Sequence, residues 1–232
     1  MRAAEAPPLD WSGPVFGTFV GYSAGRLITT ESSLTTDGTL FGIGPTTVDT
    51  YYGADSDVPF EGAFGGALIG FNRQVGAMVF GAEADIAAAN FVRSDTVPGA
   101  PHGDPRIDTS ATLHWFGTLR GTIGLAADRF HIYGTGGLAY GNAEGQVSVT
   151  PSGGTVPPTF TAGDSRMQYG YALGGGIEAA IDRHWTARLE FLYLNLGAAR
   201  YDFAFPASNG STSTSADTVT ANTVRGGLLY RF

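Results

Sequence analysis

Apolar and polar residues alternate along this chain in eight separate stretches, and no other feature of the sequence constrains the fold as strongly. In the stretch that ends the chain, Leu228, Tyr230 and Phe232 share one face of a predicted strand, and Arg225 and Arg231 share the other. A strand with aromatic and aliphatic residues on one face and arginines on the other fits a wall with lipid outside and a polar lumen inside.

The connections between the stretches alternate between short turns and long polar segments. The predicted strands cover about 14–24, 62–72, 77–89, 109–126, 130–148, 166–181, 185–197 and 224–232. The long connections, at 25–61, 90–108, 149–165 and 198–216, are rich in Thr, Ser, Gly, Asp and Pro, as solvated loops are. Short turns at one end and long loops at the other are typical of membrane barrels, and an even strand count puts both termini at the turn end.

The sequence therefore predicts an all-β fold, an eight-stranded antiparallel up-and-down transmembrane β-barrel with long extracellular loops and short periplasmic turns. We expect 14–232 to form a single barrel domain and 1–13 to form a Pro-containing periplasmic N-terminal arm. No apolar segment typical of a secretory signal precedes Pro7, so we expect an exported protein given in its mature form.

Composition supports this fold and excludes several functions. Gly 35, 12% aromatic and 15% charged residues suit a barrel better than a soluble helical protein. No stretch reaches the roughly 18 consecutive apolar residues that a membrane-spanning helix needs. Because the chain has no Cys, disulfides, thiolate zinc sites and cysteine nucleophiles are excluded. A net charge of -8 argues against a nucleic-acid partner.

Alternation also assigns a direction to each side chain. In the fourth stretch, it places Leu113 and Leu119 outward, toward lipid, and His114, Phe116 and Arg120 inward.

Seven charged residues of the predicted strands fall on the inward face: Glu83, Asp85, Arg120, Glu178, Arg188, Glu190 and Arg225. An eight-stranded barrel is just wide enough for side chains to fill it, and buried charges are costly unless they are paired. We therefore expect these residues to form a salt-bridged lumen charge network. Catalysis by Glu178 and Glu190 is disfavoured, because a filled interior leaves a substrate little room.

Two short motifs imitate enzyme signatures without the context that these need. Residues 21–25 fit the nucleophile elbow around Ser23, and 134–139 fit a dinucleotide fingerprint, but no helical pattern follows either of them. The histidines lack metal-ligand spacing, although His102 and His114 at one rim leave a haem or metal contact open. The sequence predicts no catalytic residue, no cofactor and no metal site.

Several segments together resemble the small alphaproteobacterial outer-membrane proteins, the opacity-like, OmpA-like eight-stranded barrel group (also described as a porin family). The resemblance rests on the segments 11–13, 80–85, 116–121, 133–141 and 188–193. It covers the strands and none of the long loops. It implies location in the bacterial outer membrane and recognition of a C-terminal assembly signal, here Leu228, Tyr230 and Phe232, by the barrel-assembly machinery.

We expect a structural outer-membrane protein whose surface loops serve envelope integrity, adhesion or recognition. Its expected partners are outer-membrane lipids, lipopolysaccharide and the barrel-assembly machinery. The sequence leaves open whether it binds a second copy of itself or another surface partner. The alternatives are a narrow small-solute channel, a loop-mediated ligand site such as one for haem, and a soluble lipocalin-like carrier with aromatic faces lining a cavity. Charged residues opposite the aromatic faces favour the membrane barrel over the carrier.

Overall fold

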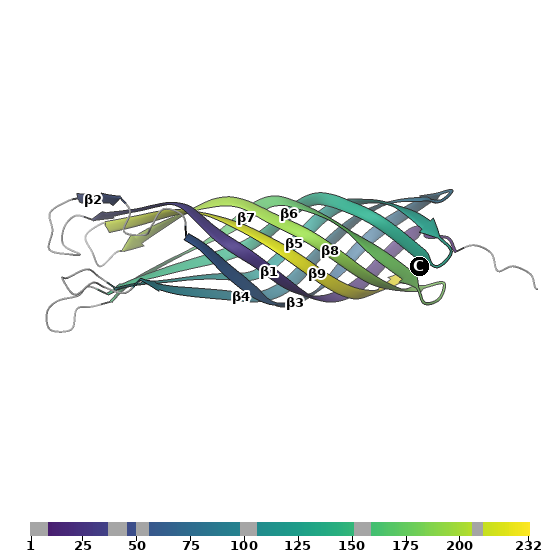
Figure 1. Ribbon diagram of the computed structural model, residues 1–232, viewed down its shortest axis with the longest axis horizontal. Coiled ribbons are helices and arrows are strands. Elements are labelled where there is room, and N and C mark those ends of the chain that lie inside the picture. The colour runs from purple at the N-terminus through teal and green to yellow at the C-terminus, as the bar shows by residue number, and fades with distance from the viewer. Residues whose placement is uncertain (1–8, 37–45, 50–55, 98–105, 151–158, 206–210) are drawn as a thin grey trace, which may run out of the picture.

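The computed structural model describes residues 9–36, 46–49, 56–97, 106–150, 159–205 and 211–232, and nearly all of them lie in β-strands (Figure 1). The strands are β1 Gly13–Thr36, β2 Thr46–Asp49, β3 Ser56–Val75, β4 Met78–Val97, β5 Arg106–Ala127, β6 Phe130–Thr150, β7 Phe160–Ala180, β8 Trp185–Phe205 and β9 Ser211–Arg231. Among these described residues, no helix is long and apolar enough to cross a membrane.

Eight long strands form a closed antiparallel barrel, as the alternation predicted. Each strand pairs with its neighbour in sequence, and β1 pairs with β9 from Val15↔Arg231 onward, so that the first and last strands close the sheet. The short strand β2 pairs only with the far end of β1. Both described ends of the chain lie at the end of the barrel with the short turns, here called the turn end (Figure 1). The opposite end is called the loop end.

The strands are much longer than the sequence predicted. Each of the eight has 20 to 24 residues, whereas about 9–11 suffice to cross a bilayer. The prediction that 25–61, 90–108, 149–165 and 198–216 are loops throughout is therefore wrong. The misreading came from their Ser and Thr content, because Thr is polar but also β-branched and well suited to a strand.

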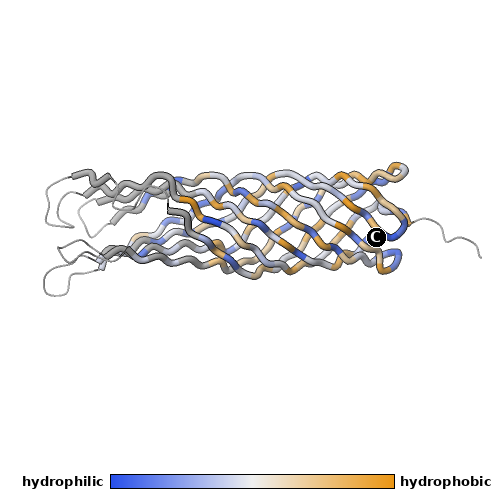
Figure 2. Tube along the Cα trace, in the orientation of Figure 1, coloured by the Kyte–Doolittle hydropathy of each residue, from blue (hydrophilic) through white to orange (hydrophobic). Residues whose placement is uncertain are grey.

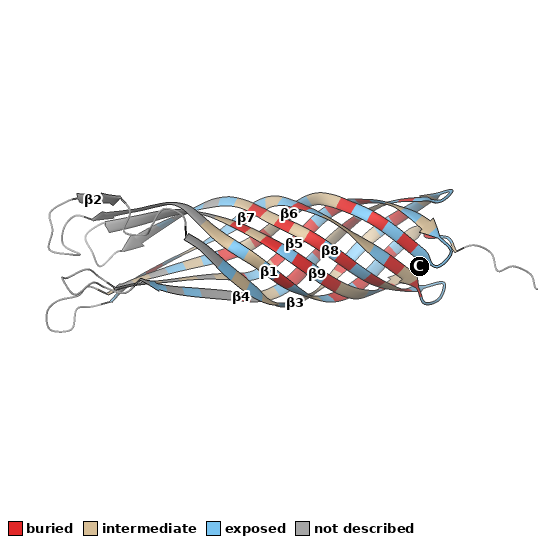
Figure 3. Ribbon diagram, viewed as in Figure 1, coloured by how far each residue is buried: buried red, intermediate tan, exposed pale blue. Residues whose placement is uncertain are grey.

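The outer surface of the barrel carries an apolar band. Along each strand, side chains on this outer surface alternate with side chains that point into the lumen. Leu119 and Phe191 are exposed on the outside, whereas Thr118 and Arg120 are buried inside. Figure 2 shows the hydrophobic residues gathered over the turn-end half, and Figure 3 shows buried and exposed residues alternating along the same strands. This apolar outer face contradicts the lipocalin-like alternative, whose aromatic faces would point inward.

Two predicted side-chain directions, those of Leu113 and His114, are wrong, because a β-bulge intervenes. The pairing of β5 with β6 shifts by a residue between Leu113 and Trp115. A bulge of this kind adds a residue to one strand and reverses the facing of everything beyond it. As a result, Leu113 is only 9% exposed and points inward, while the side chain of His114 is 53% exposed on the outside.

Toward the loop end, the barrel separates into two sheets. Within the described residues, β3 and β4 pair from Val75↔Met78 only as far as Phe64↔Ala89, although both strands continue beyond that pair. Likewise, β7 and β8 pair only as far as Tyr171↔Asn195. The other barrel pairings continue, which leaves β4–β5–β6–β7 as one sheet and β8–β9–β1–β3 as the other.

Each separation begins beside a β-bulge. The pairing of β4 with β5 shifts between Ala88 and Phe91, and that of β8 with β9 shifts between Asn195 and Ala198. In the second bulge, Gly197 has a φ of 70°, which favours glycine, and its N–H donates to Asn195 Oδ1 at 2.7 Å. The bulges therefore turn the strands out of the barrel at defined positions.

Candidate functional site

The middle of the barrel interior is occupied by charged side chains from five strands, β4, β5, β7, β8 and β9. The structure places all seven residues of the predicted lumen charge network there, each of them nearly or fully buried: Glu83, Asp85, Arg120, Glu178, Arg188, Glu190 and Arg225. They are far apart in sequence, and the inward register of each strand brings them together.

Arg120 of β5 holds three carboxylates at once. Its Nη1 donates to Glu190 Oε1 at 3.0 Å, and its Nη2 lies 3.1 Å from Asp85 Oδ2 and 3.4 Å from Glu83 Oε2. The remaining donor, Nε, binds Thr118 Oγ1 at 2.8 Å. Thr118 in turn donates to Asp85 through its hydroxyl and its backbone N–H. These contacts join β4, β5 and β8 across the lumen.

The other two arginines extend the network in both directions. Arg188 binds Glu83 through Nη1 at 2.8 Å and Glu178 through Nε at 2.8 Å. Arg225 binds Glu190 through Nε at 2.6 Å and Asp85 through Nη2 at 2.9 Å. Its guanidinium also stacks 4.3 Å from the ring centre of Phe19. Every carboxylate therefore contacts at least one arginine.

Two aromatic residues complete the network, and the sequence reading missed both. The hydroxyl of Tyr133 donates to Glu190 Oε1 at 2.7 Å, and His131 Nδ1 lies 3.3 Å from Glu178 Oε2. Both residues are on the inward register of β6, opposite the exposed Ile132. The alternation places both on the inward face, but neither side chain is permanently charged, so charge alone does not mark them as members of the network.

The N-terminal arm closes the turn end of the lumen, which the sequence did not reveal. Trp11 is fully buried, and its ring lies against that of His131. The guanidinium carbon of Arg231 lies 4.4 Å from the centre of the Trp11 ring. Arg231 Nη1 donates to the Asp10 carbonyl at 2.7 Å. The Ser12 backbone N–H, 2.9 Å from the Asp10 carboxylate, lowers the pKa of that group below its usual value. The structure describes residues 9–13 of the arm, and one of them, Trp11, is thus part of the barrel interior.

The other residues singled out in the sequence lie apart from the network. Leu228 and Phe232 are exposed on the outer wall, and the Tyr230 ring packs between Trp185 and Phe232. His114 pairs with Glu144 on the outside, at 3.2 Å, and His102 lies outside the described residues.

Both enzyme-like motifs lie within β-strands of the barrel, 21–25 in β1 and 134–139 in β6. Ser23 Oγ is 3.1 Å from Thr223 Oγ1 inside the barrel. Within the described part of the chain, no group of three or more His, Asp or Glu is arranged to hold a metal ion.

A closed antiparallel barrel with an apolar outer band, short turns at one end and a charged lumen defines an integral outer-membrane protein. The chain belongs to the family whose model is described as the outer membrane protein beta-barrel domain, which matches residues 9–232. The protein is thus a bacterial outer-membrane barrel, and its turn end faces the periplasm.

Named relatives agree with this family. The chain is 31% identical to the 31 kDa outer-membrane immunogenic protein of Brucella melitensis, over 99% of this chain and 88% of that protein. It is 30% identical to the 22 kDa outer membrane protein of Rhizobium leguminosarum, over 73% of this chain and 66% of that protein. These two names describe outer-membrane proteins and not enzymes. The chain also resembles the solved structure of the outer membrane protein OprG from Pseudomonas aeruginosa, over 95% of this chain and 97% of that one, with a TM-score of 0.48 and 12% identity.

Glu190→Gln should strongly destabilise the barrel. The substitution removes the carboxylate that Arg120 and Arg225 share, and breaking a buried pair typically costs about 3–5 kcal/mol. Glu144→Gln is the matched control, because that side chain is 53% exposed and its pairing should be worth less than about 1 kcal/mol. Urea unfolding of both variants in lipid vesicles measures the difference. Similar losses would show that the lumen charges do not act as a buried network.

Proposed function

We propose that this protein is a structural component of the outer membrane, closed to water and ions, whose loop end presents a surface for envelope integrity, adhesion or recognition. The observation that carries the proposal is the charge network, in which three arginines and four carboxylates bind one another across the lumen. Carboxylates that are ion-paired with arginines are poor general acids or bases, so we propose no catalytic role for them.

The length of the strands supports a role at the cell surface. About half of each 20- to 24-residue strand exceeds what a bilayer requires, and the excess lies at the loop end. The loop end faces the extracellular side in barrels of this kind. The Brucella relative is named an immunogenic protein, which fits a surface reached by host molecules. Lipids and lipopolysaccharide would contact the apolar band below.

Planar bilayers test whether the lumen is closed. Purified, folded protein should give no stable conductance steps, because the charge network fills the middle of the lumen and Trp11 is buried at its turn end. Protein unfolded before addition serves as the baseline. Regular, stepwise currents at a constant protein concentration would refute closure and favour the alternative of a narrow small-solute channel.

We also propose that Leu228, Tyr230 and Phe232 form a signal for the barrel-assembly machinery. The support is their position: Leu228 and Phe232 are exposed at the end of β9, the strand that closes the barrel against β1. Phe232 could instead be only an aromatic anchor at the membrane interface.

Deleting Phe232 separates these two roles. If Phe232 is part of a signal, the truncated chain should fold in detergent but accumulate in the periplasm of cells. Ile181→Ala, which removes another exposed apolar side chain near the turn end, is the control and should reach the membrane normally. Normal outer-membrane levels of the truncated chain would show that Phe232 is not part of an assembly signal and acts only as an aromatic anchor at the membrane interface.

A further inference from the structure

The outer wall of the barrel changes from apolar to polar at one level of β9, β1 and β3, which lie side by side (Figure 1). The last apolar row of outward residues across these strands is Val224, Tyr22 and Ala63. The next outward row toward the loop end is Asn222, Ala24 and Glu61. Aromatic residues such as Tyr22 mark the membrane–water interface in barrels, so this level is the outer edge of the bilayer.

A hollow with polar walls lies on the outer surface just beyond this level, toward the loop end. Its centre is Ala24, which pairs with Asn222 on one side and with Glu61 on the other. Because Ala24 carries only a methyl group and its neighbours are longer, the wall is recessed there, with a volume of about 690 Å³. The hollow, here called the polar hollow, is lined by a cation, an anion and two uncharged hydrogen-bonding side chains: Arg26, Glu61, Thr220 and Asn222.

A second hollow, here called the apolar hollow, lies beside the first on the bilayer side of the same level. It has a volume of about 790 Å³ and extends over β1, β3 and β4. Small residues form much of its lining, which includes Val20, Tyr22, Ala63, Gly65 and Ala88. The Tyr22 side chain is hydrogen-bonded to that of Glu61, so this pair lies where the two hollows meet. A molecule with a polar head and an apolar tail therefore fits both.

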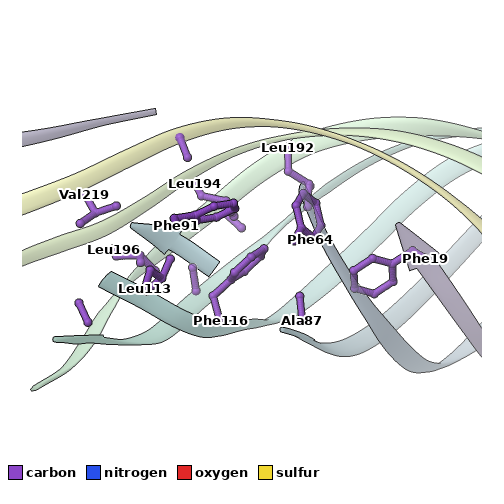
Figure 4. Packing of buried hydrophobic residues seen from close by; sticks show 14 of the residues in the cluster. Phe19, Phe64, Ala87, Phe91, Leu113, Phe116, Leu192, Leu194, Leu196 and Val219 are labelled. Atoms are coloured by element: carbon purple, nitrogen blue, oxygen red, sulfur yellow. The ribbon is translucent and has the colours of Figure 1, made fainter. Parts of the chain in front are cut away.

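Aromatic rings support both hollows from the lumen side. Gly21 and Gly25 lie on the inward register of β1, and the rings of Phe64 and Phe60 pack directly on them. A Cβ at Gly25 would come within 2.5 Å of the Phe60 ring. Figure 4 shows Phe64 in the packed apolar cluster of the lumen, where its ring centre is 5.3 Å from that of Phe116. The hollows are therefore preformed depressions in a wall that is backed by packed side chains.

The position and chemistry of the hollows indicate what occupies them. The apolar hollow faces the bilayer, where water is excluded and lipid chains are the available filling. The polar hollow lies at the level of the outer-leaflet headgroups. Arginine is well suited to bind phosphate, while Glu, Thr and Asn side chains bind hydroxyl and amide groups. An acylated, phosphorylated sugar has all of these groups, and the lipid A part of lipopolysaccharide is such a molecule, whereas a glycerophospholipid has no sugar in its core.

We propose that the two hollows together bind one lipopolysaccharide molecule at a fixed position on the outer wall. An acyl chain of its lipid A lies in the apolar hollow, and a phosphorylated sugar lies in the polar hollow. Arg26 binds the phosphate, and Glu61, Thr220 and Asn222 form hydrogen bonds with the substituents of the sugar. The site deepens the proposed function and rests on it only for the contact between the barrel wall and the lipids of the outer membrane.

Native mass spectrometry of the full chain, folded in detergent, measures the preference of the site. The protein is titrated with diphosphorylated lipid A, with lipid A that lacks its phosphates, and with phosphatidylglycerol, which has a phosphate but no sugar. Diphosphorylated lipid A should bind one per barrel and at least roughly tenfold more tightly than the other two, because it alone supplies both phosphate and sugar. Equal affinity for phosphatidylglycerol would overturn the proposal, since the site would then be one for phospholipids.

Two variants at exposed positions locate the site. Arg26→Gln removes the phosphate partner and Ala24→Leu fills the polar hollow, so each should weaken the binding of diphosphorylated lipid A at least roughly tenfold. The matched controls are Arg200→Gln on β8 and Ala82→Leu on β4, which change exposed residues outside both hollows and should bind as the unchanged protein does. Unchanged affinity in Arg26→Gln and Ala24→Leu, or equal losses in the controls, would overturn the site.

The outcome is separable from that of the proposed function. A shift in gel migration on boiling confirms that each variant is folded before its binding is measured. Bilayer conductance tests the closed lumen without reference to lipid A. Variants that bind lipid A as the unchanged protein does while the lumen stays closed would therefore overturn the lipid site alone, and the structural role would remain.

Discussion

Backbone hydrogen bonding in a medium without water is the constraint on which this structure depends. Inside the bilayer each unpaired N–H or C=O costs several kcal/mol, so a sheet that crosses it must close on itself. The pairing of β1 with β9 meets this requirement. Beyond the bilayer, water can satisfy the same groups, and the requirement ends. The β3–β4 and β7–β8 pairings stop where the chain leaves the apolar band, at Ala89 and Asn195, each beside a β-bulge.

The interior follows a second constraint, which is that an eight-stranded barrel must fill its lumen with its own side chains. This chain fills it in two layers. Around Arg120, the fill is ionic, and its ion pairs join five strands, β4, β5, β7, β8 and β9. Around Phe116, it is aromatic and aliphatic. The ionic layer lies toward the turn end of the lumen, and the apolar layer lies above it toward the loop end.

The strand order, the closure and the facing of most side chains could be predicted from the sequence, because a period of two fixes the face of every residue in an unbroken strand. Leu113 was misassigned because a bulge changes the count by one residue, and nothing in the local composition marks it. Trp11 was missed because the arm at 1–13 shows no apolar period. The pairing of Arg188 with Glu83, 105 positions apart, depends on the stagger of strands around the barrel, which the sequence does not carry.

Amide hydrogen exchange, resolved by residue in lipid nanodiscs, tests most directly whether full pairing is confined to the bilayer. Successive amides of β3 point alternately toward β1 and β4. In the part of β3 from Phe64 to Val75, both sets should be protected, since both neighbours pair there. In 56–63, the amides directed at β1 should stay protected, while those directed at β4 should exchange rapidly. Uniform protection along the whole of β3 would contradict the account, as would rapid exchange within the bilayer.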